Sequence, residues 1–332
     1  MMRLPWFEYR APRSVDEVAR ILAGEGPGAM LVAGGTDLLP NMKRRHQSPS
    51  TLIALRGVEE LKATANGAGL RLGAGLTLTE VVDSPAVRSR YTGLWQAAAQ
   101  VATPHLRNMG TLGGNVCLDT RCTYYNQSYE WRKAIEFCLK KDGETCWVAT
   151  ASKRCVAVSS TDTAPALIAL DAKARLASVG GSRDVAIADL YRNDGIDYLS
   201  RRPDEVLTAL LLPEAQGWRS TYWKLRRRGS FDFPVLGVAA AAKLAADGTV
   251  EAARIALGAV ASRPFLVPKV GEAMAGKKLT DDAIAEAAAI VASRAKPMDN
   301  ADMNLYWRKE VVASFTAYAL RELRGDDMRA ER

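Results

Sequence analysis

Histidine and long hydrophobic runs are scarce in this sequence, and each scarcity narrows what the protein can be. Only His46 and His105 occur among the 332 residues, which excludes a site built on several imidazole ligands, and we expect both to be structural. No stretch approaches the roughly 18 consecutive apolar residues that cross a bilayer. The first residues reach Pro5 and Glu8 before any apolar signal-peptide core develops. We therefore expect a cytoplasmic protein that does not enter a membrane.

Cysteine is missing from most of the chain. All five cysteines lie between Cys117 and Cys155, whereas cysteines used only for packing would be scattered, because a buried thiol behaves as a small hydrophobe. The clustering indicates a metal or cluster site, a set of disulfides, or a redox device. In a reducing compartment a metal-binding or catalytic role is favoured over disulfides.

The charge balance is basic, with a net charge of +8 and basic runs at residues 43–45 and 226–228. Such a balance suits an acidic partner protein, a phosphorylated ligand or a nucleic acid, and it is also compatible with ordinary solvated faces. No helix-turn-helix, zinc-finger or RNA-binding aromatic pattern accompanies these runs. We therefore expect no nucleic-acid binding.

Helices and strands alternate over the first 115 residues, which is typical of α/β architecture. Ser14 and Glu17 form a candidate capping box for the first helix. The expected helices are 15–22, 79–87 and 94–101, and the expected strands are 29–33, 52–55 and 70–74. An irregular segment, about 117–158, then interrupts the pattern. We expect it to be a functional insertion with one helix at 130–140.

A domain boundary is expected near 213–218, because the pattern changes there. Beyond it the sequence predicts strands at 220–225, 235–244 and 252–260, then helices at 281–295 and 306–323. Strands followed by helices are typical of an α+β domain. We thus expect a domain over 1–215, made of two subdomains with the cysteine-rich insertion at about 117–158, and a second domain over 216–325.

Two glycine-rich motifs are candidates for binding phosphate groups. The first, residues 30–37, reads Met-Leu-Val-Ala-Gly-Gly-Thr-Asp, and the second, residues 108–115, reads Asn-Met-Gly-Thr-Leu-Gly-Gly-Asn. Glycines at the end of a strand allow successive backbone N–H groups to approach an anion. Neither motif is a dinucleotide fingerprint or a Walker sequence. Taken alone, each is also typical of an ordinary turn.

In combination, the two motifs and the later Ser160-Thr161-Asp162 segment resemble one family. This family is the FAD-binding subunits, or medium chains, of the molybdenum hydroxylases, and the resemblance extends from about Trp6 to Leu323. It implies an α+β fold: a two-subdomain FAD-binding fold of the vanillyl-alcohol oxidase (PCMH) type, followed by a C-terminal α+β domain with an antiparallel sheet and helices.

The resemblance also implies roles for particular residues. Asp162 would contact the flavin nucleotide and Lys224 would lie near the flavin, although a helix N-cap and a solvated strand residue are the plain alternatives for these two. No residue of this chain is expected to catalyse substrate chemistry. The pyrophosphate would be held by Met30, Leu31, Val32, Ala33, Gly34, Gly35, Thr36 and Asp37, and by Thr111, Leu112, Gly113, Gly114 and Asn115.

The insertion departs from the family pattern, in which only a handful of residues separate the second motif from the aspartate. Here Asn115 and Asp162 are 47 positions apart (162 − 115). This departure resembles the β subunits of the 4-hydroxybenzoyl-CoA reductase type, whose loop carries a [4Fe–4S] cluster. It implies reductive dehydroxylation to benzoyl-CoA with ferredoxin as electron donor. The implied partners are a large molybdenum-cofactor subunit and a small [2Fe–2S] subunit, assembled as a dimer of heterotrimers.

The cysteine spacing agrees with a cluster, since a cubane needs four thiolates and no histidine is near. No Cys-x2-Cys pair occurs, which disfavours a zinc ribbon, although zinc or disulfides stay as alternatives. Cys117 lies two residues after Asn115 and is expected to pack in the flavin region. The expected cluster ligands are Cys122, Cys138, Cys146 and Cys155.

Other functions stay open at this point. The wider alternative is the FAD subunit of a xanthine or carbon monoxide dehydrogenase type of enzyme with a structural metal loop. Two further classes are a stand-alone flavin oxidase or dehydrogenase and a metal-binding scaffold without flavin. We expect an electron relay rather than a site of substrate chemistry.

Overall fold

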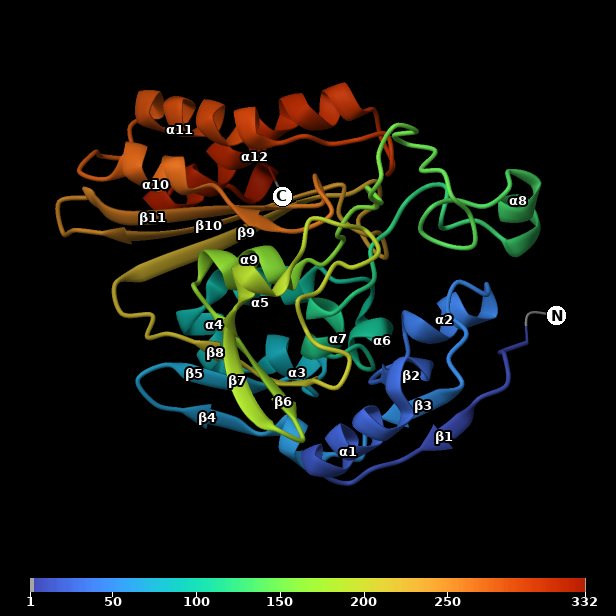
Figure 1. Cartoon of the computed structure of the whole chain (residues 1–332). Coiled ribbons are helices and arrows are strands. Elements are labelled where there is room, and N and C mark those ends of the chain that lie inside the picture. The colour runs from blue at the N-terminus through green and yellow to red at the C-terminus, as the bar shows by residue number, and fades with distance from the viewer. Residues whose placement is uncertain (1–2, 332) are drawn as a thin grey trace.

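The computed structural model describes residues 3–331, and its first part is a small parallel sheet (Figure 1). The sheet has the order β1-β3-β2. Ser14 Oγ accepts a hydrogen bond from Glu17 N, as expected for a cap, but the Glu17 carboxylate accepts from Arg13 N rather than from Ser14 N. The elements are β1 (Glu8–Arg10), α1 (Val15–Glu25), β2 (Ala29–Val32), α2 (Leu38–Lys43) and β3 (Thr51–Ala54).

The second part is an antiparallel sheet of order β4-β5-β8-β6-β7, covered by helices. Its strands are β4 (Thr64–Asn66), β5 (Leu70–Gly73), β6 (Lys173–Ser178), β7 (Gly181–Ala186) and β8 (Val206–Leu212). Its helices are α3 (Leu78–Asp83), α4 (Pro85–Arg90), α5 (Thr92–Ala99), α6 (Pro104–Arg107), α7 (Leu112–Val116) and α9 (Thr163–Ala169).

The single helix expected at 79–87 is in fact two helices, α3 and α4. Pro85 has no N–H to donate and restricts Ser84 to an extended conformation, so the first helix ends there. Ser84 then caps the second helix, and its hydroxyl accepts from Val87 N at 3.4 Å. The chain therefore changes direction where a continuous helix was expected.

The third part is an antiparallel sheet of order β12-β11-β10-β9 with helices on its outer side (Figure 1). Its elements are β9 (Trp218–Leu225), β10 (Leu236–Leu244), β11 (Val250–Gly258), β12 (Phe265–Leu266), α10 (Pro268–Met274), α11 (Asp281–Arg294) and α12 (Leu305–Arg324). The α+β fold with a C-terminal antiparallel sheet and helices is thereby confirmed.

Both faces of this third sheet are buried, which explains the nearly continuous apolar sequence of β10. Ala239 and Ala241 face the core shared with α5 and α9, and Val238 and Ala240 face the core under α11 and α12. Successive side chains of a strand point to opposite faces. Small residues on one face let the helices of the second part pack closely, so a larger side chain at Ala239 would overpack the core.

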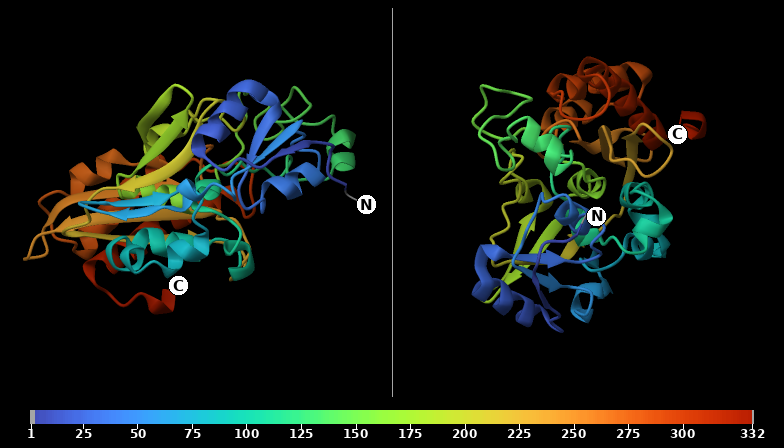
Figure 2. Two further views of the ribbon diagram at one scale, coloured as in Figure 1. Left: turned by 90° about the horizontal axis from the view of Figure 1, so that it is seen from below. Right: turned by 90° about the vertical axis from the view of Figure 1, so that its right-hand side faces the viewer.

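The insertion is mostly irregular and projects beside α2, at the end of the molecule (Figure 2). Its one α-helix, α8 (Tyr129–Ala134), is shorter than expected. The next turn contains Glu136 and Phe137 at φ +61° and +62°, conformations that cannot continue a right-handed helix. Arg121 and Val158 close the base of the insertion by two backbone hydrogen bonds of 2.8 and 2.7 Å.

Across residues 3–331, each helix is too short or too polar to cross a bilayer.

Candidate functional site

A cleft of about 800 Å³ contains most of the expected flavin residues. Both motifs and the aspartate after the insertion line it, so segments far apart in the sequence meet at one site. Leu112 does not line the cleft, because its side chain is fully buried in the core, and Lys224 does not line it either. The expected residues that do line it are Met30 through Asp37, Thr111, Gly113, Gly114, Asn115 and Asp162.

Gly34 allows the loop after β2 to lie directly against the start of the second motif. A Cβ atom on Gly34 would lie 1.8 Å from the Met109 carbonyl oxygen, so no other residue fits without moving the backbone. The next residue, Gly35, has φ +70°, which also favours glycine. The two motifs are thus in contact, and the local structure explains why glycine occupies positions 34 and 35.

The two motifs differ in the backbone donors that they offer. Within residues 3–331, the N–H groups of Gly34–Asp37 donate to no acceptor. By contrast, Leu112 N donates to Leu76 O at 2.8 Å, and Gly113 N donates to Ala74 O at the same distance. Free N–H groups at the end of a strand are suited to binding an anion. The first motif therefore supplies these donors, and the second motif forms a wall of the cleft.

Asn115 joins the two ends of the insertion. Its Oδ1 atom accepts hydrogen bonds from Thr161 Oγ1 at 2.9 Å, from Thr163 N at 3.1 Å and from Thr163 Oγ1 at 2.7 Å. Asn115 ends the second motif, whereas the two threonines follow the insertion. The side chain therefore fixes the cleft wall at the point where the insertion leaves and re-enters the fold.

Asp162 and Lys224 form a buried ion pair. Lys224 Nζ lies 2.9 Å from Asp162 Oδ2, and Tyr222 donates its hydroxyl to Asp162 Oδ1 at 2.8 Å. Asp162 precedes α9, but its side chain makes no capping hydrogen bond. Burial raises the pKa of Asp162, and Lys224 and Tyr222 oppose that rise. Asp162 therefore occupies the N-cap position of α9 without capping it by its side chain, and Lys224 is not a solvated strand residue.

Every carboxylate that lines the cleft has a cationic partner. The pairs are Asp37 with Arg121, Asp119 with Lys140, Asp162 with Lys224, Asp197 with Arg192, and Asp232 with Arg228. Arg44 and Arg201 also line the cleft, and within residues 3–331 neither pairs with a carboxylate. The cleft therefore carries surplus positive charge and suits an anionic ligand.

Sequence reasoning missed several residues of this cleft. Arg201 belongs to no motif, and Arg44 was noted only as part of a basic run. Tyr198, Phe231 and Phe233 add aromatic surface to the lining, which suits a ring system. The guanidinium carbon of Arg121 lies 5.3 Å from the centre of the Phe233 ring.

The four expected cluster ligands lie in the insertion, and all are buried and free of disulfides: Cys122, Cys138, Cys146 and Cys155. The pKa of the Cys122 thiol is raised to about 11, mainly by burial, with smaller contributions from Cys138 and Cys146 that backbone hydrogen bonds from Tyr124 and Tyr125 oppose. Burial likewise raises the pKa of Cys155 to about 11, with Cys146 and Cys122 adding to it.

These thiols do not form a finished metal site. In the part of the chain that the structure describes, no three His, Cys, Asp or Glu side chains are placed to hold a metal ion. The expected [4Fe–4S] cluster therefore has no support from this arrangement, because neutral, buried thiols pack as small apolar groups.

Cys117 belongs to the flavin side of the structure, as expected. It lines the cleft and packs against the core of the second part of the fold. Burial raises its pKa, and the charge of Arg201 opposes that rise. The charge that lowers the pKa of Cys117 therefore comes from Arg201 in the cleft. The groups that act on the pKa of Cys122 and Cys155 all belong to the insertion.

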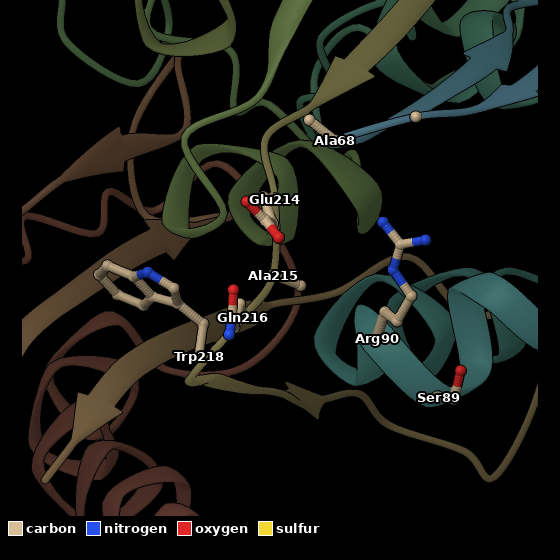
Figure 3. Close-up of a pocket in the computed structure, with 8 residues that line it drawn as sticks. Ala68, Ser89, Arg90, Glu214, Ala215, Gln216 and Trp218 are labelled. Atoms are coloured by element: carbon tan, nitrogen blue, oxygen red, sulfur yellow. The ribbon is translucent and has the colours of Figure 1, made fainter.

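A second hollow, of about 360 Å³, lies away from this cleft (Figure 3). It lies between the turn that joins β4 to β5, the end of α4 and the segment that links β8 to β9. None of the expected site residues lines it. Its lining residues are Gly67, Ala68, Ser89, Arg90, Glu214, Ala215, Gln216 and Trp218.

Two family models match the chain. Residues 5–215 match the FAD binding domain in molybdopterin dehydrogenase, and residues 220–323 match the CO dehydrogenase flavoprotein C-terminal domain. The FAD-binding subunit of an aldehyde oxidoreductase from Escherichia coli K12 is 33% identical over 79% of this chain and 83% of its own length. The glyceraldehyde dehydrogenase medium chain of Sulfolobus acidocaldarius is 27% identical over 96% of this chain and 99% of its own.

Solved structures agree with these matches. A chain of the carbon monoxide dehydrogenase from Hydrogenophaga pseudoflava superposes with a TM-score of 0.79 at 26% identity, covering 97% of this chain and 99% of its own. A chain of quinoline 2-oxidoreductase from Pseudomonas putida 86 gives a TM-score of 0.75, also at 26% identity, covering 97% and 98%. The protein therefore belongs to the FAD-binding medium subunits of the molybdenum hydroxylase family.

Proposed function

We propose that this chain relays electrons through FAD to partner subunits, and does not itself transform a substrate. The observation that carries the proposal is the cleft, where free N–H groups at Gly34–Asp37 and surplus positive charge meet an aromatic lining. When bound, FAD exchanges one or two electrons. The amides would hold its pyrophosphate, the paired Asp162 would orient its flavin end, and the cleft would exclude water from the ring.

The proposed partners follow from the family. A large molybdenum-cofactor subunit would carry the substrate chemistry, and a small [2Fe–2S] subunit would connect it to this chain, in a dimer of heterotrimers. The ion pairing of every carboxylate in the cleft supports a binding role over a general base. We also propose a division into domains at 1–215, with the insertion at about 117–158, and 216–325, and a cytoplasmic location, where the five thiols stay reduced.

A visible spectrum of the purified full-length chain, with flavin and iron analysis, tests this proposal. We expect one FAD per chain and no turnover of organic substrates by the chain alone. Steady turnover by the isolated chain would identify a stand-alone flavoenzyme instead. Absence of flavin would identify a scaffold.

We further propose that the insertion binds a [4Fe–4S] cluster. The supporting observation is that Cys138 and Cys146 lie near enough to raise the pKa of Cys122, and Cys146 and Cys122 near enough to raise that of Cys155, while Cys117 lies in the cleft. Coordination to iron would draw the four sulfur atoms together, so the insertion would contract when the cluster binds. The proposed ligands are Cys122, Cys138, Cys146 and Cys155.

Serine substitution of each cysteine, followed by iron counting, tests the ligand set. Serine at any of the four proposed ligands should remove most of the iron, whereas Cys117→Ser should retain it. Iron loss in Cys117→Ser together with retention in Cys122→Ser would overturn the assignment. Zinc in place of iron would support a structural metal loop instead.

The narrowest proposal is a 4-hydroxybenzoyl-CoA reductase subunit that receives electrons from ferredoxin, and it rests on the insertion alone. The similar proteins include carbon monoxide and aldehyde-oxidising enzymes, which favours the wider alternative of another molybdenum hydroxylase with a metal loop. Dehydroxylation of 4-hydroxybenzoyl-CoA by the assembled complex, driven by reduced ferredoxin and slowed by salt, would support the narrow proposal. Inactivity of the fully loaded complex in this assay would overturn it.

A further inference from the structure

One lysine of the insertion is bonded to two residues at the start of the insertion and to one residue of the segment between β7 and β8. Lys140 Nζ donates to Asp119 Oδ1 at 2.8 Å, to Thr120 Oγ1 at 2.8 Å and to Gly195 O at 2.6 Å. Its side chain is only 6% exposed. An ammonium group has three N–H donors, so all of them are used. We call these three contacts the Lys140 anchor.

The anchor reaches the wall of the cleft through Asp119. This residue lines the cleft, and its second oxygen, Oδ2, accepts from Tyr125 Oη at 3.0 Å and from Gln47 Nε2 at 3.3 Å. Tyr125 belongs to the insertion and stacks on His46, with ring centres 4.3 Å apart. One carboxylate therefore connects the insertion, the cleft wall and the segment after α2.

The same stretch of chain also reaches the first glycine motif. Arg121, two residues after Asp119, pairs with Asp37 and donates to Asn41 Oδ1 at 2.9 Å. Lys140 itself does not line the cleft. An effect of Lys140 on a ligand therefore passes through Asp119–Arg121 or through Gly195, which directly precedes the cleft-lining segment 196–199.

We propose that Lys140 is a positioning residue for FAD, and that the affinity for FAD depends on the folded insertion. The proposal rests on the proposed binding of FAD in this cleft. Breaking a buried ion pair leaves an uncompensated charge, and Asp119 would then move toward solvent in the cleft. That movement would displace Arg121 from Asp37, beside the free N–H groups of the first motif.

The coupling must act in both directions. If the folded insertion strengthens FAD binding by some factor, FAD strengthens the folded state of the insertion by the same factor. Bound FAD should therefore slow hydrogen exchange of backbone amides in the insertion, far from its own contacts. A purely local role for Lys140 would not produce this protection.

The chain offers a matched control in the adjacent lysine. Lys141 pairs with Asp142 at 2.9 Å, so its charge is paired inside the insertion. We would measure the Kd of FAD for flavin-stripped, full-length Lys140→Met, Lys140→Arg and Lys141→Met chains. Coupling free energies between sites commonly correspond to on the order of tenfold in affinity. We expect a loss of that size for Lys140→Met, partial recovery in Lys140→Arg, and no change in Lys141→Met.

Hydrogen exchange of the unmodified chain, with and without FAD, gives a readout that needs no variant. Unchanged exchange in the insertion on FAD binding would overturn the proposal, even if Lys140→Met fails to fold. A normal Kd for FAD in a folded Lys140→Met chain would also overturn it. Gly34→Ala separates the two proposals. If this variant binds FAD normally, the proposal that FAD binds in this cleft fails. If it loses FAD while Lys140→Met keeps it, only the positioning role of Lys140 fails.

Discussion

The ammonium of Lys224 lies 2.9 Å from the carboxylate of Asp162, with side-chain exposures of 0% and 3%. Lys224 belongs to β9 in the C-terminal sheet, whereas Asp162 precedes α9 and lines the cleft. The pair therefore connects the C-terminal sheet to the ligand cleft. Lys224 also donates to Gln100 O at 3.0 Å, so two acceptors from different segments stabilise its ammonium group.

Replacing Lys224 by methionine should destabilise the protein strongly. Asp162 would stay buried without its cation, and removing one partner of a buried pair costs about 3–5 kcal/mol. Urea denaturation of the full-length chain measures the free energy of unfolding. The double variant Lys224→Met/Asp162→Asn should recover most of the loss, and a double variant as unstable as the single one would contradict this explanation.

The same variant should depend on pH in a defined direction. Burial already raises the pKa of Asp162, and loss of Lys224 raises it further. The folded state then binds more protons than the unfolded state, so stability is greatest below the ordinary pKa of aspartate and falls as pH rises through the raised value. Denaturation midpoints between pH 5 and pH 8 test this, and the Asp162→Asn double variant should lack the decline.

Arg44→Met and Arg201→Met should each weaken FAD binding by roughly 10- to 100-fold, because a charge-assisted contact to phosphate contributes about 1.5–3 kcal/mol. Riboflavin has no phosphate, so its affinity should not change. Fluorescence titration of the flavin-stripped chain with both ligands gives the comparison. Arg45→Met is the neighbouring control, since Arg45 does not line the cleft. Equal losses for FAD and riboflavin would argue against a phosphate contact.

Gly34→Ala should abolish FAD binding and lower stability by about 3 kcal/mol, because its Cβ would overlap the Met109 carbonyl and force the two motifs apart. Thermal denaturation and flavin content measure the two effects. Gly67→Ala is a suitable control, because no atom lies within 4 Å of the added Cβ. Normal flavin content in Gly34→Ala would contradict the binding of FAD in this cleft.

The insertion thiols should react slowly in the metal-free protein. With the pKa of Cys122 and Cys155 near 11, their thiolate fraction at pH 8 is roughly 200-fold below that of an ordinary cysteine. Alkylation by iodoacetamide, followed by peptide mass spectrometry, should show rates that rise steadily up to about pH 11. Because the pKa of both thiols is higher in the folded state than in the unfolded state, the free energy of unfolding should fall as pH rises through 11. Rapid alkylation at pH 8 would indicate that the loop is open.

Local patterns in the sequence predicted the fold well where a single physical rule decides the structure. The apolar strand β2, which ends at Val32 just before the first glycines, and the two long C-terminal helices formed as expected, because their periodicity agrees with their burial. The break at Ser84–Pro85 was also readable in principle from the proline. The short helix of the insertion was harder, because the turn at Glu136 depends on how the loop packs.

The cleft was predictable only in part. Both glycine motifs are recognisable from their local composition. Arg201 is not, because only the tertiary fold brings it to the cleft. The pairing of Asp162 with Lys224 joins positions 62 residues apart. For Leu112, the motif was correct but the direction of the side chain was not, since the neighbouring glycines face the cleft and the leucine faces the core.

The two-faced C-terminal sheet limits how this subunit assembles with others. Helices cover both faces of the sheet, so neither face is left for another chain. Any contact through this domain must use the outer surfaces of its helices, the sheet edges or the connecting turns. The start of α12 offers exposed aromatic surface, at Tyr306 and Trp307. Changes in partner preference can therefore accumulate on the exterior of this domain without disturbing the alanine-lined interior that the fold requires.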